Sequence, residues 1–271
     1  LGQGNIVSEN SFTAYDEVLA STDKLITIVP VAGGLFNMGS PEDEAERRKD
    51  EGPVHAVRLS DFWISTLEIP WDVYELFVYR NADSPAENQG EVTLEIDGIS
   101  GATMPYVNYN KPGYPAINIT QYAASQFCKW LTAKTGHYYR LPTEAEWEKA
   151  ACWDEKNQRK TIFPWGNESP DTLHANLLES YLWNYSEIGA YPDGKSHYGC
   201  HQMIGDVWEW TSTEFFGYPG FKTGFSEYND KWFANQKVLR GGSFGTPSIS
   251  IRGSYRNFFR LDERWMFSGF R

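Results

Sequence analysis

The feature that most constrains the fold is the C-terminal stretch 199–271, where aromatic residues, arginines and glycines alternate without the apolar spacing of a helix. It begins Gly-Cys-His-Gln-Met-Ile-Gly-Asp-Val-Trp-Glu-Trp-Thr (199–211), continues Val-Leu-Arg-Gly-Gly-Ser-Phe (238–244) and ends Ser-Gly-Phe-Arg (268–271). Such a stretch does not build a helical bundle. It predicts irregular loops held by short strands, a kind of surface that often carries binding residues.

Composition favours the same architecture over the whole chain. Aromatic residues make up 16% of the 271 residues, and 24 glycines and 14 prolines indicate many turns. A core of rings and short strands is therefore expected, more than a leucine-rich bundle. We predict one α+β domain over residues 25–271, with two main helices and short antiparallel strands, after an N-terminal tail or tether at residues 1–24.

Local signals place the main elements. The β-branched run 25–31 predicts a strand, and Gly33-Gly34 predicts a turn into a partner strand at 35–39. Residues 41–51, with six acids and three bases, predict a solvated loop. Two helices are expected at 120–132 and 142–151, with Thr120 and Thr143 as N-caps, Gly136 as a C-cap and a Thr143–Glu146 capping box.

Charge and cysteine content exclude several classes of protein. The formal net charge of −12 argues against a nucleic-acid-binding protein. No apolar run is long enough to span a bilayer. Three cysteines (Cys128, Cys152 and Cys200) give no disulfide framework. The polar tail suits a tether after a removed signal peptide, and equally a boundary of the expressed chain, so we expect a secreted, periplasmic or cell-envelope protein.

Seven motifs occur in an order that resembles the formylglycine-generating enzyme, or sulfatase-modifying factor, family. They are Gly-Leu-Phe-Asn-Met-Gly (34–39), Arg-Leu-Pro-Thr-Glu-Ala-Glu-Trp-Glu (140–148), Pro-Trp-Gly-Asn (164–167), Ala-Asn-Leu (175–177), Gly-Asp-Val-Trp-Glu-Trp (205–210), Arg-Gly-Gly-Ser (240–243) and Gly-Phe-Arg (269–271). The resemblance implies that family's irregular α+β fold, a relative of the C-type lectin fold. The C-terminal third is most similar to ergothioneine-type sulfoxide synthases.

The resemblance implies a copper-binding pair of cysteines, which this chain does not have. The positions that match the pair are Ser248 and Gly253, and no cysteine follows Cys200. A hydroxyl and a hydrogen do not replace two thiolates, the soft ligands that cuprous copper prefers. No copper is therefore expected, and our first prediction is a non-catalytic binding or scaffold domain for a protein or small-molecule ligand.

The alternative is a domain or subunit of an oxygen-dependent, carbon–sulfur bond-forming enzyme of the sulfoxide-synthase type. The resemblance implies a three-histidine iron site on a separate helical bundle, which this chain lacks. His197 and His201 have helical ligand spacing, but Gly199 between them argues against a helix. The metal site of such an enzyme is thus expected elsewhere. The long polar segment 81–113 also prompts the possibility of a larger assembly.

Calcium is the metal that the resemblance implies for the chain itself. Asn176 and Leu177 match one family site, with Asn184 or Glu187 as a further ligand, and Asp206 matches a second. Carboxylate, amide and carbonyl oxygens suit this cation. A structural calcium is expected, although Asp206 could instead cap a turn.

A ligand is expected on the C-terminal loops, where aromatic residues and arginines crowd together as they do in recognition hot spots. Packing of core rings and arginines is the competing interpretation. The candidate ligand-binding residues are Arg252, Tyr255, Arg256, Asn257, Phe259, Arg264 and Trp265.

Overall fold

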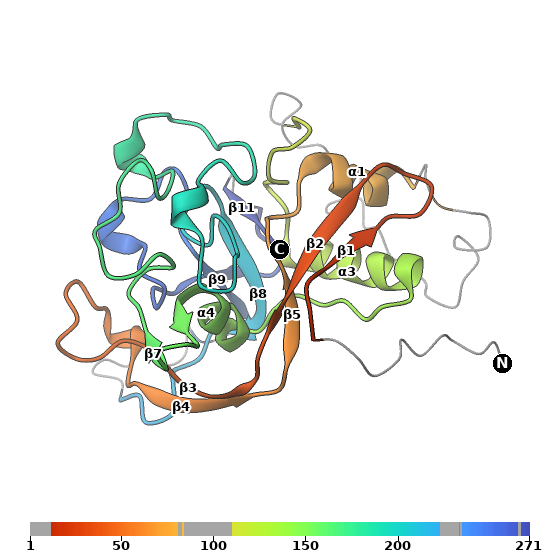
Figure 1. The fold of residues 1–271 in the computed structure, drawn as a ribbon. Coiled ribbons are helices and arrows are strands. Elements are labelled where there is room, and N and C mark those ends of the chain that lie inside the picture. The colour runs from red at the N-terminus through yellow and green to blue at the C-terminus, as the bar shows by residue number, and fades with distance from the viewer. Residues whose placement is uncertain (1–11, 81–82, 84–109, 223–232, 234, 265–266) are drawn as a thin grey trace.

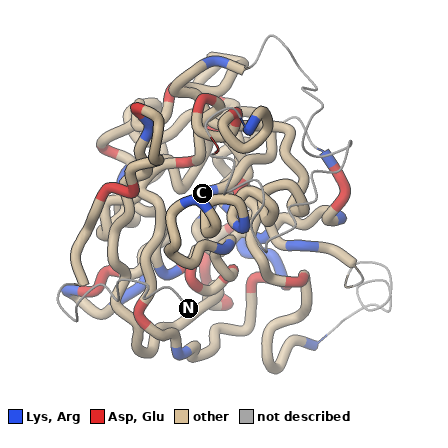
Figure 2. Tube along the Cα trace, turned by 90° about the vertical axis from the view of Figure 1, so that its right-hand side faces the viewer, with Lys and Arg blue, Asp and Glu red and all other residues tan. Residues whose placement is uncertain are grey.

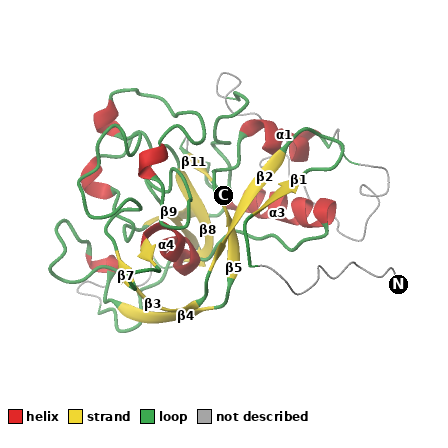
Figure 3. Ribbon diagram, viewed as in Figure 1, coloured by secondary structure: helices red, strands yellow, loops and turns green. Residues whose placement is uncertain are grey.

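The computed structural model describes residues 12–80, 83, 110–222, 233, 235–264 and 267–271 (Figure 1). The elements are short and loops connect most of them, as Figure 3 shows. Helices and antiparallel strands are mixed, which confirms the predicted α+β class. The expected segment 81–113 lies almost wholly outside the described residues. No helix in the described part is both long and apolar enough to cross a membrane.

One antiparallel ribbon runs through two sheets in the N-terminal half. Strand β2 (Leu25–Val31) pairs with β5 (Phe62–Ser65), and β3 (Gly34–Met38) pairs with β4 (His55–Leu59). The register is continuous, because Val31 faces Phe62 and Gly34 faces Leu59. The predicted hairpin between residues 25–31 and 35–39 is therefore wrong. Gly33 marks the bend of the ribbon, where a Cβ would lie 2.6 Å from the carbonyl oxygen of Leu59.

The ordered fold begins before the predicted boundary at residue 25. Strand β1 (Tyr15–Val18) pairs with β2 and completes a three-stranded sheet in the order β1-β2-β5. Part of the predicted tail at residues 1–24 is thus a strand of the domain, and residues 1–11 lie outside the described residues.

The helices begin and end where their capping residues predict. Helix α3 (Gln121–Thr135) starts after Thr120, whose side chain accepts from the N–H of Ala123, and it ends at Gly136 in the left-handed conformation. Helix α4 (Glu144–Cys152) has the predicted capping box of Thr143 and Glu146. A third, shorter helix is α1 (Trp71–Tyr79).

The C-terminal half is built on a four-stranded sheet in the order β10-β9-β8-β11. Its strands are β8 (Trp208–Glu214), β9 (Gln236–Arg240), β10 (Asn257–Arg260) and β11 (Ser268–Gly269), and β11 runs parallel to β8. A small pair, β6 (Trp153–Asp154) and β7 (Arg159–Lys160), follows α4. One buried cluster packs α1 and α3 against the sheets, and a second lies under α4.

Candidate functional site

Strand β10 presents a partly exposed aromatic surface. The ring of Tyr255 lies 6.0 Å from that of Trp208, and the ring of Phe259 lies 6.3 Å from that of Trp210. Because successive strand residues alternate sides, Asn257 shares this face with Phe259. Tyr255 lies just before the strand and joins the surface through its ring contact with Trp208. We call Trp208, Tyr255, Asn257 and Phe259 the β10 face. All four are partly buried, so a ligand from solvent can reach them.

Arg48 completes this surface from the N-terminal half. Its guanidinium lies over the ring of Tyr255, 5.3 Å from the centroid, and donates to the Tyr255 hydroxyl at 2.7 Å. The Arg48 side chain is 43% exposed, and its Nε lies 3.7 Å from the buried carboxylate of Asp50. No local signal in the sequence points to Arg48, which lies more than 200 positions from its partner in a segment interpreted as a solvated loop.

Arg256, just before β10, points away from this surface and contacts other parts of the fold. Its Nε and Nη2 donate to Glu144 at 2.6 and 3.0 Å, and its Nη1 donates to the carbonyl oxygens of Asp50 and Phe216. Its guanidinium also lies 4.2 Å from the ring centre of Tyr218. With 1% of its surface exposed, Arg256 is placed to position the strand, not to meet a ligand.

Beneath Arg256 lies a buried network of charges. Arg240 donates to Glu144 at 2.6 Å and to Glu148 at 2.9 Å. The Tyr218 hydroxyl accepts a hydrogen bond from Arg240 and donates one to Glu144. Burial alone raises the pKa of Glu144, but Arg256 and Arg240 outweigh it and hold that pKa below its ordinary value. Arginines thus hold Glu144 and Glu148 within the fold.

Arg252 is likewise an internal partner. It pairs with Glu51 through Nη2 and lies 3.0 Å from Glu44 through Nε. Glu51 and its neighbour Asp50 are fully buried, so the predicted solvated loop at 41–51 is wrong at its C-terminal end. The physical reason is that buried charges require partners, and Arg252 supplies one from a distant part of the chain.

The last two candidate ligand residues differ in what the structure describes. Arg264 is partly buried, and its Nε and Nη2 find no hydrogen-bond partner among the described residues. Trp265 lies outside the described residues. Of the seven candidates, Tyr255, Asn257 and Phe259 share one surface, while Arg252 and Arg256 lie beneath it.

The positions that match the copper-binding pair are occupied by other contacts. Ser248 donates through its backbone N–H and hydroxyl to Glu179. At Gly253 a Cβ would lie 2.1 Å from the Sγ of buried Cys152. A cysteine at residue 253 therefore has no room unless Cys152 moves.

The predicted calcium ligands come together around Asn176. Its Nδ2 lies within 2.8–2.9 Å of the Asn184 carbonyl oxygen, the Ser186 hydroxyl and Oδ1 of Asp206. Its Oδ1 is buried without a partner among the described residues. Leu177 is adjacent in the chain, but its carbonyl accepts from the N–H of Ser180 within a turn. Asn184 contributes its main chain, because its side chain accepts from the N–H of Tyr185.

Two further residues join this polar cluster, Gln202 and Glu68. Gln202 donates to Oδ2 of Asp206 at 2.5 Å and lies 3.4 Å from Glu68. Burial raises the pKa of Asp206 to about 7, and burial together with Asp206 raises that of Glu68 well above its ordinary value. Gln202 could have been suspected from its place in the motif four residues before Asp206. Glu68 carries no such signal.

The described residues offer no redox-metal site. No group of three or more His, Cys, Asp or Glu is placed to hold a metal ion in the part of the chain that the structure describes. His197 and His201 lie in irregular backbone, as Gly199 predicted. His197 lies 3.8 Å from Asp154, and burial lowers the pKa of His201.

Charged positions are interspersed over the fold. In Figure 2 the Lys and Arg positions lie among Asp and Glu positions, without forming one basic band in that view. This distribution agrees with the net charge of −12 and gives no support to a nucleic-acid surface.

Comparison with known proteins shows relatives that are enzymes. The hercynine oxygenase of Mycolicibacterium smegmatis is 32% identical over 265 residues, which cover 90% of this chain and 60% of that protein. The mouse (Mus musculus) formylglycine-generating enzyme is 24% identical, with coverage of 81% and 66%. The chain therefore spans about 60% of the length of the mycobacterial relative.

A solved structure has nearly the same extent. PvdO from Pseudomonas aeruginosa superposes with a TM-score of 0.71 at 25% identity, over 97% of this chain and 98% of that one.

The prediction of a non-catalytic scaffold domain is wrong. Hercynine oxygenases are named for an enzymatic activity, and three of them match this chain at 32–38% identity. The likeness favours the alternative reading, a domain of an oxygen-dependent enzyme. The absence of the copper-binding cysteines at Ser248 and Gly253 excludes one reaction type, and it does not exclude catalysis of another kind.

The family is shown by its sequence profile. The description of that family is sulfatase-modifying factor enzyme 1-like domain, and it matches residues 16–271. The match includes strand β1, the bent ribbon, the capped helices and the sheet that carries the β10 face. This chain belongs to the sulfatase-modifying factor enzyme 1-like family.

Proposed function

We propose that this chain is the substrate-binding domain of an oxygen-dependent, carbon–sulfur bond-forming enzyme of the sulfoxide-synthase type. The observation that carries the proposal is the β10 face, which combines partly exposed aromatic rings with the neighbouring cation Arg48. The buried ion pairs of Arg240 and Arg256 with Glu144 lie next to this surface. The likeness to hercynine oxygenases over 90% of the chain supports it. So does the resemblance of the C-terminal third to sulfoxide synthases.

The redox metal of such an enzyme does not fit the described residues, because these offer no cluster of ligands. We assign no redox step to them. Their part is to bind and orient the organic substrate and to restrict its contact with water. The metal is supplied by residues outside the described part or by another chain.

The β10 face suits a substrate like the one that gives the relatives their name. Hercynine is histidine whose amino nitrogen carries three methyl groups, so it bears a permanent positive charge that cannot donate a hydrogen bond. Such groups bind against electron-rich ring faces. Tyr255 already holds the Arg48 guanidinium 5.3 Å from its ring centroid, which supports a ring suited to cations. Trp208 provides the neighbouring ring.

Arg48 gives this surface a donor for the substrate's carboxylate. Its guanidinium is partly exposed and carries the charge that pairs best with a carboxylate. Rings for the ammonium group and a guanidinium for the carboxylate would together orient a betaine. The buried pairs of Arg240 and Arg256 with Glu144 keep the segment that carries Tyr255 in place.

We also propose that a calcium ion stabilises the domain at the Asn176–Asp206 cluster. Oxygen atoms of Asn184, Ser186 and Asp206 surround Nδ2 of Asn176, and Oδ1 of that amide lacks a partner among the described residues. A flip of the Asn176 amide would present Oδ1 to a cation bound among these oxygens. Hard oxygen donors of this kind suit calcium. A cation would also compensate the buried carboxylates of Asp206 and Glu68, whose negative charges burial disfavours.

The proposed substrate site is tested by calorimetric titration of the purified chain with hercynine. Tyr255→Ala should weaken binding about tenfold, because a cation over an aromatic ring contributes roughly 0.5–2 kcal/mol. Tyr255→Phe keeps the ring and should bind nearly as well. Tyr198→Phe, which removes a hydroxyl bonded to Glu155 elsewhere, is the matched control. Equal affinity of wild type and Tyr255→Ala would contradict the proposed site.

A further inference from the structure

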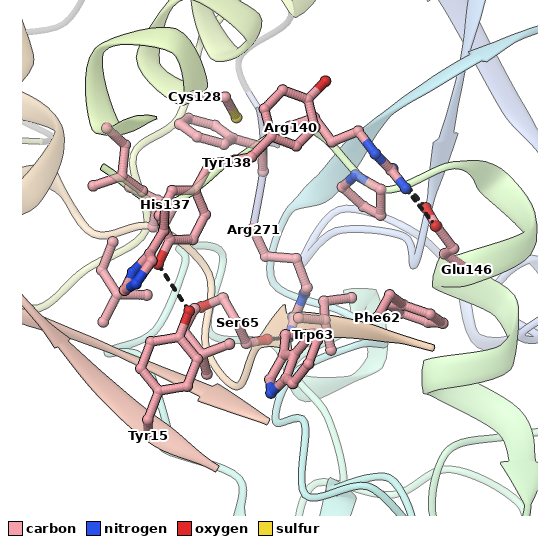
Figure 4. A pocket seen from close by; sticks show the side chains of 18 of the residues that line it. Tyr15, Phe62, Trp63, Ser65, Cys128, His137, Tyr138, Arg140, Glu146 and Arg271 are labelled. Carbon is pink, nitrogen blue, oxygen red and sulfur yellow. Dashed lines mark hydrogen bonds and ion pairs between the residues drawn. The ribbon is translucent and has the colours of Figure 1, made fainter. Parts of the chain in front are cut away.

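A second site lies between the three-stranded sheet and α3. A cavity of about 700 Å³ opens there, within the range typical of small-molecule pockets (Figure 4). Protein interiors rarely leave gaps much larger than a water molecule, so a space of this size needs an explanation. None of its lining residues belongs to the β10 face or to the Asn176–Asp206 cluster.

The walls of the cavity are apolar. Strands β2 and β5 supply aliphatic side chains, and α3 faces them with aromatic and aliphatic ones. These wall residues are Ile26, Ile28, Ile64, Phe127, Cys128 and Leu131. At the rim, Trp63 is 45% exposed and Tyr138 is 80% exposed. Exposed rings beside an apolar interior favour an apolar ligand body.

The charged groups around the cavity already have partners. Arg140 makes two hydrogen bonds to Glu146 at 2.6 and 2.7 Å, and Figure 4 shows this pair at one end of the cavity. Arg271 is paired with Glu209 behind the wall, and Asp61 accepts from the N–H of Gly33. An anionic ligand would therefore have to displace an internal carboxylate. The cavity favours an uncharged ligand.

A chain of hydrogen bonds leaves one acceptor for that ligand. Glu17 accepts from His137 at 2.6 Å and from the Tyr139 hydroxyl at 2.5 Å. Tyr139 has then used its only hydrogen, so Tyr15, whose hydroxyl lies 3.0 Å away, must donate to Tyr139. The Tyr15 oxygen keeps its lone pairs as acceptors. Burial raises the pKa of both tyrosines, which keeps both hydroxyls protonated.

We propose that this cavity binds an uncharged aromatic or alicyclic alcohol, with its rings between β2, β5 and α3 and its hydroxyl donating to Tyr15. The hydroxyl of Tyr15 lies among the side chains that line the cavity, at the end of a dashed line in Figure 4. This site is independent of the proposed function, because none of its lining residues belongs to the β10 face.

The test compares three probes by calorimetric titration of the intact chain: 2-naphthol, naphthalene and naphthalene-2-sulfonate. We expect 2-naphthol to bind at least ten times more tightly than the sulfonate. Tyr15→Phe should weaken 2-naphthol about tenfold, the loss of one hydrogen bond, and leave naphthalene unchanged. Tyr198→Phe is again the matched control. Equal affinities for 2-naphthol and the sulfonate, or no binding of 2-naphthol at its solubility limit, would overturn the proposal.

Two experiments test whether 2-naphthol binds in this cavity: one on the wild-type chain, and one on a variant in which a larger side chain fills the cavity. Cys128 lines the cavity and the other two cysteines do not, so bound 2-naphthol should slow its reaction with an uncharged maleimide. The reaction is run at neutral pH, which keeps 2-naphthol uncharged, and over long incubation times, because burial raises the pKa of Cys128 to about 12 and slows its reaction. Cys128→Phe should abolish binding if it folds, as judged by circular dichroism. If saturating 2-naphthol leaves the rate of the Cys128–maleimide reaction unchanged, the ligand binds elsewhere.

Discussion

Removing Arg240 should destabilise the domain strongly. In Arg240→Met the carboxylates of Glu144 and Glu148 stay fully buried and lose their shared guanidinium, and the carbonyl of Gly253 loses a donor at 2.6 Å. Deleting one partner of a buried ion pair costs about 3–5 kcal/mol, because the remaining charge is left without compensation. Here Arg256 and Lys160 still contact the two carboxylates, so the lower end of this range is expected.

Urea denaturation followed by tryptophan fluorescence measures this cost. With a slope of about 3 kcal/mol per molar, a loss of about 3 kcal/mol lowers the midpoint by about 1 M. Arg260→Met is the matched control, because its pair with Asp262 is 62% and 61% exposed and contributes roughly 0–1 kcal/mol. Equal midpoint shifts for the two variants would refute the assignment of Arg240 as the centre of the network.

The same network predicts a pH dependence. The folded-state pKa of Glu144 is depressed, so its contribution to the free energy of unfolding is present above its unfolded pKa and is lost as pH falls through the folded value. Wild-type stability should therefore decline below about pH 4. The difference in free energy of unfolding between wild type and Arg240→Met should become smaller over the same acidic pH range, because protonated carboxylates no longer need the guanidinium. A gap that stays constant down to pH 3 would contradict this origin.

Three further predictions concern other parts of the fold. Gly253→Ala should lower the melting temperature, because overpacking against Cys152 typically costs about 1–3 kcal/mol. Adding Cys152→Ala should restore most of the lost stability. If the double variant is not restored, Cys152 is not the obstacle. A calcium chelator should lower the melting temperature, and calcium at about 100 times its Kd should raise stability by about 2.7 kcal/mol; an unchanged response in Asn176→Ala would argue against the proposed site. With copper, oxygen and a sulfatase-type cysteine peptide, mass spectrometry should detect no formylglycine, and turnover would contradict the consequence drawn from Ser248 and Gly253.

Local signals predicted helix ends and fold class well. Thr120, Gly136 and the Thr143–Glu146 box act within a few residues, so their effect can be read from the sequence alone. The bend at Gly33 could not be recognised, because strands 25–31 and 34–38 pair with partners that only the tertiary structure brings close.

The candidate site was predicted in part for the same reason. Asn257 and Phe259 follow strand alternation and share a surface with Tyr255, but the partners of Arg252 and Arg256 lie more than 100 residues away. Without those partners, a buried structural arginine and a ligand-binding arginine have the same appearance in sequence. Arg48 was missed because a run of mixed charges resembles any solvated loop.

The central claim is that the β10 face recognises a trimethylated ammonium group. Calorimetric titration of the chain with hercynine and with histidine tests it most directly, because the two molecules differ only in the methyl groups that favour an aromatic surface. Hercynine should bind at least ten times more tightly than histidine. Equal affinities, or no detectable binding of hercynine at millimolar concentration, would contradict it.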